Sequence, residues 1–155
     1  MLDRNEIEIL QVALAHEERA RKFYDRLAGA HGATPAGDLF AFLAAEEEGH
    51  IAKISAVHGI PRFEAGWEEA RLPGLIDIEG LAWEEAVEAA AAAGDAAIRK
   101  GLEIAARAEG AAISFYSRAG AVADGRETKA LLSQLEAEER LHLGKIERYL
   151  KDLAG

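Results

Sequence analysis

Two Glu-x-x-His motifs, each with a glutamate thirty residues before it, are the residues of this sequence best suited to bind a metal. Carboxylate oxygens and imidazole nitrogens are donor atoms that iron, manganese and zinc accept in proteins. On a helix, a glutamate and a histidine three residues apart share one face, so that both can reach the same ion. The candidate ligands are Glu17, Glu47, His50, Glu109, Glu139 and His142.

The number of these groups predicts a site for two divalent cations. Four carboxylates in an apolar interior would repel one another and lose hydration, which costs several kcal/mol per ion. Two divalent cations would supply four positive charges against these four negative ones. One imidazole for each ion would complete a mixed nitrogen and oxygen shell, which suits iron or manganese.

The motifs are parts of a longer internal repeat, which is seen when the sequence is superposed on itself with a shift of 92 residues. A single Glu-x-x-His motif usually lies on a solvated helix face, but two copies in register, each with its partner glutamate, favour a shared site. The repeat predicts two equivalent helical hairpins. The identical pairs are Ala13/Ala105, Glu17/Glu109, Ala20/Ala112, Phe23/Phe115, Tyr24/Tyr116, Arg26/Arg118, Leu39/Leu131, Leu43/Leu135, Ala45/Ala137, Glu46/Glu138, Glu47/Glu139, His50/His142, Lys53/Lys145 and Ile54/Ile146.

The elements that must position these ligands are predicted to be helices, because alanine, leucine, glutamate and arginine dominate and no alternation of β-branched residues suggests a strand. Asp3 and Glu6 have the spacing of a capping box at the start of the first helix, and Asp95 is expected to cap the third. The long helices are expected at 3 to about 29, 34–58, 95 to about 121, and from about 127 to 153. The predicted layout of a single domain, 1–155, is a hairpin at 3–58, a long crossover with a short extra helix at 59–94, and a hairpin at 95–153.

On all four long helices the candidate ligands replace apolar residues of the stripe that should face the core. Glu17 and Glu47 each lie about fifteen residues from the turn near Gly32, which corresponds to about 22 Å along a helix. The second hairpin repeats this spacing around Asp124. The sequence therefore predicts an all-α four-helix bundle in which the six groups lie in one layer.

The composition limits the other classes of function. The 155 residues carry a formal net charge of −10, which disfavours nucleic acid and anionic lipid as partners. The chain has no cysteine, so disulfides and thiolate-bound metal clusters are excluded. No apolar run approaches the length of a membrane span, and the segment MLDRNEIEIL is too polar for a signal peptide, so a soluble cytoplasmic protein is expected.

The ligand segments resemble the rubrerythrin branch of the ferritin-like superfamily over nearly the whole chain. The resemblance implies a ferritin-like bundle with a di-iron centre, in which manganese or zinc could substitute for iron. It also implies that Tyr24 and Tyr116 donate hydrogen bonds to ligand carboxylates. The segments that carry the resemblance are Glu17 to Tyr24, Glu47 to His50, Glu109 to Tyr116 and Glu139 to His142. The implied arrangement has Glu47 and Glu139 bridging both ions, Glu17 and His50 completing one, and Glu109 and His142 completing the other.

The activity that this resemblance implies is an iron-dependent peroxidase that acts in oxidative stress, in a homodimer or larger homo-oligomer. Two departures weaken the match. Rubrerythrins carry a cysteine-ligated rubredoxin module, which is lacking here, so an external electron donor would be needed. They also have an extra glutamate where this chain has Ala112, and its loss favours a bacterioferritin-like ferroxidase that stores iron in an oligomeric cage. A non-catalytic metal-binding or structural bundle is the alternative from another class.

Several residues near the motifs are expected to have no direct role. His16 points about 100° away from Glu17 on the helix and is expected at the surface or beside the site. Residues expected to be surface charges are Glu18, Glu46, Glu48 and Glu138, although Glu46 remains an alternative ligand. His31 and His58 are expected at helix ends, and Phe23, Phe115, Trp67 and Trp83 in the core.

Overall fold

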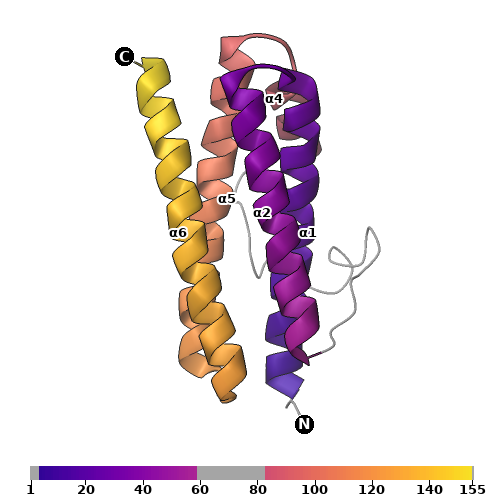
Figure 1. Ribbon diagram of the computed structural model, residues 1–155, viewed down its shortest axis with the longest axis vertical. Helices are drawn as coiled ribbons and strands as arrows, with labels where there is room; N and C mark the ends of the chain where they lie inside the picture. Colours follow the sequence, from indigo (N-terminus) through magenta and orange to yellow (C-terminus); the bar gives the residue numbers. More distant parts are fainter. Residues whose placement is uncertain (1–3, 59–82, 155) are drawn as a thin grey trace.

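The computed structural model describes residues 4–58 and 83–154, and all regular structure within these ranges is helical (Figure 1). The predicted all-α class is therefore confirmed for the described residues. The helices are α1 (Arg4–His31), α2 (Pro35–His58), α4 (Trp83–Ala90), α5 (Asp95–Val122) and α6 (Arg126–Ala154). Among them, no helix is long and apolar enough to cross a membrane.

The four long helices form a bundle of two antiparallel pairs, α1 with α2 and α5 with α6 (Figure 1). The pairs meet where α2 lies against α6 and where α1 lies against α5. The short helix α4 packs on α5 and α1. The predicted crossover at 59–94 lies outside the described residues except for α4 and the turn that follows it.

Local sequence explains how the first pair turns. Gly32 has a φ of 44°, a left-handed conformation that favours glycine and ends α1 two residues beyond the predicted boundary. The Thr34 hydroxyl accepts a hydrogen bond from the Gly37 N–H at 3.0 Å, and Pro35 is the first residue of α2. This combination of a threonine cap and a proline at the first helical position fixes the start of α2.

The predicted cap of α5 is corrected. Gly94, with a φ of 100°, is the residue that caps α5, and no side chain makes a capping hydrogen bond there. Asp95 lies one residue inside the helix, where its carboxylate favours the positive end of the helix dipole. The capping box predicted from Asp3 and Glu6 includes Asp3, which lies outside the described residues. The Glu6 carboxylate accepts a hydrogen bond from the Gly125 N–H at 2.6 Å. Since the Gly125 carbonyl accepts the first helical bond of α6, from Lys129, Glu6 caps α6 from the opposite hairpin.

This contact between hairpins gives a first prediction. Replacing Glu6 with alanine is expected to lower the free energy of unfolding by about 1–2 kcal/mol, because the backbone N–H at the start of α6 loses a charged acceptor. Urea unfolding of the metal-free protein would measure the loss. Glu103→Ala, at an exposed position of α5, is the control, and an equal loss in both variants would contradict the capping role.

Two apolar clusters fill the bundle on either side of the candidate ligands. One includes Leu10 and Leu14 with Ile54 and Leu132, and the other includes Phe40 and Leu102 with several further residues of the four helices. Glu17 follows one cluster and precedes the other along α1, so that the acidic groups lie between two layers from which water is excluded.

Candidate metal centre

Each long helix contributes to a buried cluster at mid-height of the bundle. The structure brings together all six ligand residues predicted from the sequence, and none is more than 3% exposed. They are Glu17 from α1, Glu47 and His50 from α2, Glu109 from α5, and Glu139 and His142 from α6. They are buried because each lies within the apolar stripe of its helix, and this stripe is the face that packs against the core.

The cluster divides into two overlapping sets of four residues. In each set, one ligand atom from each residue lies within 4.8 Å of the others. The sets are Glu17, Glu47, His50 and Glu139, and Glu47, Glu109, Glu139 and His142. Glu47 and Glu139 belong to both, as would be required of carboxylates that bridge two ions.

Both imidazoles turn Nδ1 towards the carboxylates. His50 Nδ1 lies 2.9 Å from Glu139 Oε1, 3.2 Å from Glu47 Oε2 and 3.3 Å from Glu17 Oε2. His142 Nδ1 lies 3.4 Å from Glu47 Oε1, and 3.6 Å from oxygens of Glu109 and Glu139. The two rings are nearly parallel, with centroids 5.4 Å apart and an interplanar angle of 14°.

The charges of the cluster shift its pKa values strongly. Burial lowers the pKa of His50, but the carboxylates of Glu139, Glu17 and Glu47 outweigh burial and hold it well above its usual range. In the same way, burial lowers the pKa of His142, but Glu139 and Glu47 raise it to about 9. Burial raises the pKa of Glu47, and the charges of Glu17 and Glu139 raise it further. The metal-free cluster therefore retains protons at neutral pH, chiefly on its imidazoles.

Glu17 behaves differently from Glu47. Burial raises its pKa, but hydrogen bonds from Glu47 and His50 outweigh burial and hold the pKa well below the usual range. Glu17 is thus stabilised in its charged form, whereas the charged form of Glu47 is disfavoured.

Buried atoms without a hydrogen-bond partner provide a test of whether these residues fit metal ions. Buried polar atoms are nearly always paired, so each exception needs an explanation. Within the described residues, the buried atoms that make no hydrogen bond include Glu47 Oε1, Glu109 Oε2, Glu139 Oε1 and His142 Nδ1, all from the cluster. Glu139 Oε1 and Glu47 Oε1 lie close to imidazole nitrogens, but not at a hydrogen-bonding angle. An acceptor oxygen or a ring nitrogen that lacks a protein donor is suited to coordinate a cation, and this donor set fits two divalent ions.

Two buried tyrosines hold carboxylates of the cluster from the opposite hairpin. The Tyr24 hydroxyl donates to Glu109 Oε1 at 2.6 Å, and the Tyr116 hydroxyl donates to Glu17 Oε1. Burial raises the pKa of both phenols, and neighbouring carboxylates raise it further, so both remain hydrogen-bond donors. Each hairpin thus orients a glutamate of the other.

The tyrosines give a second prediction. Tyr24→Phe and Tyr116→Phe are each expected to weaken metal binding by about tenfold, because a carboxylate that is held in place binds better than one that must be ordered by the ion. Competition with a chelator of known affinity would measure the change. Tyr149→Phe, far along α6 from the cluster, is the matched control, and a loss as large in this control would argue against an orienting role.

Two residues that were expected to be surface charges lie beside the histidines. Glu138 Oε2 is 2.8 Å from His50 Nε2, and Glu46 Oε2 is 3.9 Å from His142 Nε2. Glu46, His50 and His142 also have ligand atoms within 4.8 Å of one another, although both histidines already belong to the two sets. The 92-residue repeat contained a signal for these neighbours, since Glu46 and Glu138 are identical across it.

Of the other charged residues and histidines, Glu18 differs from its prediction. Glu18 is buried and forms an ion pair with Arg21 at 3.2 Å, because it lies in the stretch of α1 that is buried on every side. His16 is buried beside the cluster, which is one of the two places predicted for it, and it belongs to neither ligand set. Burial lowers its pKa. His31 lies at the end of α1, as predicted, and is buried there, with its Nε2 2.7 Å from the Ala90 carbonyl of α4.

Some of the remaining predictions are confirmed, and others concern residues or side chains that the structure does not describe. Phe23 and Phe115 are buried in the core, as predicted, and Glu48 is exposed, as predicted. The expectations for Trp67 and for the side chains of His58 and Trp83 lie outside the part of the chain that the structure describes.

The comparisons with known proteins support the architecture. No protein-family model matches the sequence, and no curated protein matches it. A crystal structure of a DUF305 fragment from Deinococcus radiodurans is similar to this chain, with a TM-score of 0.77, 18% sequence identity and coverage of 97% of this chain and 98% of that one. At this identity the likeness shows a shared helical fold, and the function must be argued from the site itself.

Proposed function

We propose that this chain is a ferritin-like di-iron protein of the rubrerythrin type, built from two duplicated hairpins, and that it acts as an oxidoreductase on hydrogen peroxide or dioxygen. The observation that carries the proposal is the overlap of two buried sets of four ligands that share Glu47 and Glu139. Two bridging carboxylates, with one more glutamate and one histidine for each ion, supply the pattern of a dinuclear carboxylate centre.

The roles of the residues follow from the two sets. Glu17 and His50 would hold one iron with the bridging pair, and Glu109 and His142 would hold the other. When bound, two Fe(II) ions supply electrons for reducing peroxide or dioxygen. Tyr24 and Tyr116 keep ligand carboxylates in place, and the two apolar clusters exclude water from the layer between them. Without cysteines, the chain depends on an external reductant.

Ala112 supports a second function, the oxidation of Fe(II) as a substrate for storage or detoxification. This alanine is fully buried, one turn after Glu109, so the chain has no carboxylate where rubrerythrins have an additional one. A ferroxidase of this kind would form a large hollow homo-oligomer and would oxidise more than two irons per chain. Size-exclusion chromatography therefore separates it from the peroxidase.

A third prediction tests the centre directly. Anaerobic titration of the metal-free protein with Fe(II) is expected to saturate near two ions per chain and to raise the melting temperature, because binding occurs only in the folded state. Peroxide or air would then be added, and near-ultraviolet absorption of Fe(III) would report the reaction. A faster reaction with peroxide supports the peroxidase, and turnover beyond two irons supports the ferroxidase.

The titration can also reject the proposal. Saturation at two ions without any oxidation would identify a non-catalytic metal-binding bundle. A protein that binds no iron and melts at an unchanged temperature would be a structural bundle, and the di-iron proposal would then be wrong.

A further inference from the structure

The surroundings of the two histidines differ, although the sequence around them is repeated. On one side, the Glu138 carboxylate is fixed by two donors from different helices. Its Oε1 accepts a hydrogen bond from Lys53 Nζ at 2.9 Å and another from Gln134 Nε2 at 3.3 Å. Its Oε2 lies 2.8 Å from His50 Nε2. Lys53 belongs to α2 and Gln134 to α6, so the carboxylate is held across the interface between the hairpins.

Glu138 Oε2 and His50 Nε2 are each available as a hydrogen-bond partner for the other. The two atoms are at hydrogen-bonding distance but not at a hydrogen-bonding angle, and neither has another hydrogen-bond partner. Because His50 Nδ1 faces Glu17, Glu47 and Glu139, its Nε2 is the nitrogen left to donate a proton outward. A small rotation of the ring or the carboxylate is enough to complete the bond.

Beside His142, the equivalent carboxylate of Glu46 is not fixed in this way. Glu46 Oε2 is 3.9 Å from His142 Nε2, and the Glu46 side chain is 42% exposed, compared with 26% for Glu138. Lys145, the repeat equivalent of Lys53, places its Nζ 5.3 Å from the centroid of the Phe42 ring rather than on the glutamate. A cation over an aromatic face is a favourable arrangement that draws Lys145 away from Glu46.

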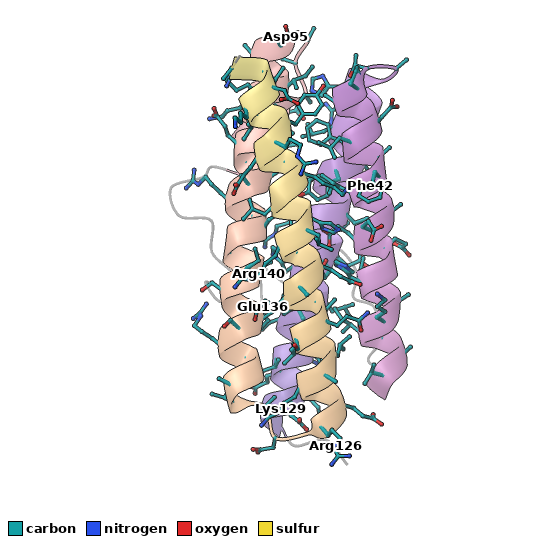
Figure 2. The ribbon with its side chains drawn as sticks, turned by 60° about the vertical axis from the view of Figure 1, so that its left-hand side comes forward. Phe42, Asp95, Arg126, Lys129, Glu136 and Arg140 are labelled. Atoms are coloured by element: carbon teal, nitrogen blue, oxygen red, sulfur yellow. The ribbon has the colours of Figure 1, made fainter. Side chains whose placement is uncertain are left out.

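Phe42 is the source of the difference. It occupies the position that is equivalent to Gln134, so the amide that donates to Glu138 has no counterpart for Glu46. Its ring meets the His142 ring edge-on, with centroids 6.4 Å apart and an interplanar angle of 79°. In Figure 2, Phe42 lies on α2 at the face where α2 approaches α6. His142 thus contacts the aromatic ring of Phe42, and its nearest outer carboxylate, that of Glu46, lies farther away than Glu138 lies from His50.

From this contrast we infer that Glu138 is a positioning residue for His50, and that the two metal positions are inequivalent, with the first ion binding on the His50 side. The inference rests on the proposed dinuclear site. A carboxylate that accepts the outer N–H of a ligating imidazole fixes the orientation of the ring and makes its other nitrogen a stronger donor. Losing such a partner typically weakens metal binding by about 10–100-fold.

Cobalt(II) titration under anaerobic conditions tests this inequivalence without any measurement of activity. The wild type is expected to bind two Co(II) ions in two resolved steps that differ by about 10–100-fold in affinity. Glu138→Gln is expected to weaken the first step by about tenfold and so bring the two steps together. Glu46→Gln, the matched change in the other half of the repeat, is expected to change either step by less than about threefold, because Glu46 is not anchored.

Two further variants separate positioning from a general effect of charge. Phe42→Gln supplies the missing amide and releases Lys145, so it is expected to strengthen the second step. Glu138→Asp keeps the charged acceptor and is expected to restore part of the first step. In the proton NMR spectrum of the cobalt form, the exchangeable N–H of His50 should shift in Glu138→Gln and should stay in place in Glu46→Gln.

Two results would overturn the inference: two steps of equal affinity in the wild type, or equal weakening by Glu138→Gln and Glu46→Gln. Binding of fewer than two cobalt ions by the wild type would instead overturn the dinuclear site on which the inference rests.

Discussion

Replacing Glu47 with glutamine is expected to abolish dinuclear metal binding and, at the same time, to stabilise the metal-free protein. Glu47 belongs to both ligand sets, so its loss affects both ions. The opposite effect on stability follows from the electrostatics of the cluster. Burial raises the pKa of Glu47, and the charges of Glu17 and Glu139 raise it further, so its charged form is disfavoured in the folded protein.

The sign of this effect depends on which charge is in excess. Removing one partner of a balanced buried ion pair destabilises a protein, because the other charge is left uncompensated. Here four carboxylates face two imidazoles, so negative charge is in excess and folding disfavours the charged form of Glu47. A neutral amide at this position removes that cost. The amide of glutamine keeps the shape of the side chain and can donate to Glu17, which already shares a hydrogen bond with Glu47.

Urea unfolding and metal titration of the same variant would check both effects. The free energy of unfolding of the metal-free variant is expected to rise by about 1–4 kcal/mol, the range for buried ion pairs that are replaced by hydrophobic residues of similar volume. Its affinity for the second ion is expected to fall by more than about a hundredfold. Glu48→Gln changes an exposed neighbour and should alter neither quantity. A metal-free Glu47→Gln protein that is less stable than the wild type would contradict the electrostatic account.

The stability of the metal-free protein is also expected to fall as the pH rises from about 6.5 to about 9, while stabilisation by metal grows over the same range. The pKa of His142 is raised in the folded protein from 6.5 to about 9. A group whose pKa is raised by folding stabilises the fold below its unfolded pKa, and this contribution is lost as the pH rises through the folded value. For His142 the contribution is on the order of 3 kcal/mol.

His50 and Glu17 do not reverse this dependence of stability on pH. The pKa of His50 is also raised, so its contribution is lost at still higher pH. The pKa of Glu17 is lowered, so its contribution is present above the unfolded value of 4.5 and does not change between neutral and alkaline pH. Metal ions compete with protons for the same nitrogens and oxygens, so metal affinity rises with pH.

Thermal melts with and without Mn(II), at about pH 6, 7.5 and 9, would show both trends. The melting temperature of the metal-free protein should fall with pH, and the increment due to metal should grow. His142→Gln should flatten the fall in the metal-free protein. A metal-free wild type that becomes more stable over this interval would show that the imidazoles do not carry the protons assigned to them.

The helices and the convergence of the six candidate ligands could be predicted because they depend on local patterns. The positions of glycine and proline placed the ends of α1, α2 and α5 within about two residues, which is the usual uncertainty of helix boundaries. The 92-residue repeat placed the ligands at equal heights on their helices. Periodicity then turned all six to the core, where the structure has them.

The contacts between the hairpins could not be predicted in this way. Periodicity gives the face of a helix but not the residue that faces it from another helix. For this reason the capping of α6 by Glu6, and the bonds of Tyr24 to Glu109 and of Tyr116 to Glu17, are visible only in the structure. The burial of Glu18 was missed because α1 is covered on more than the one face that its apolar stripe indicates.

The exchange of tyrosine contacts between the hairpins has a consequence for how such a chain can evolve. Two copies of one hairpin, assembled as a symmetric pair of separate chains, would supply the same four glutamates, two histidines and two tyrosines. Every substitution in such a pair would appear twice, so its two metal positions would have to be alike. Fusion into a single chain removes that requirement, because Phe42 and Gln134 can then differ while the ligands stay matched. A fused chain can therefore bind one ion tightly and exchange the other. A symmetric pair of chains cannot, because its two metal positions are identical.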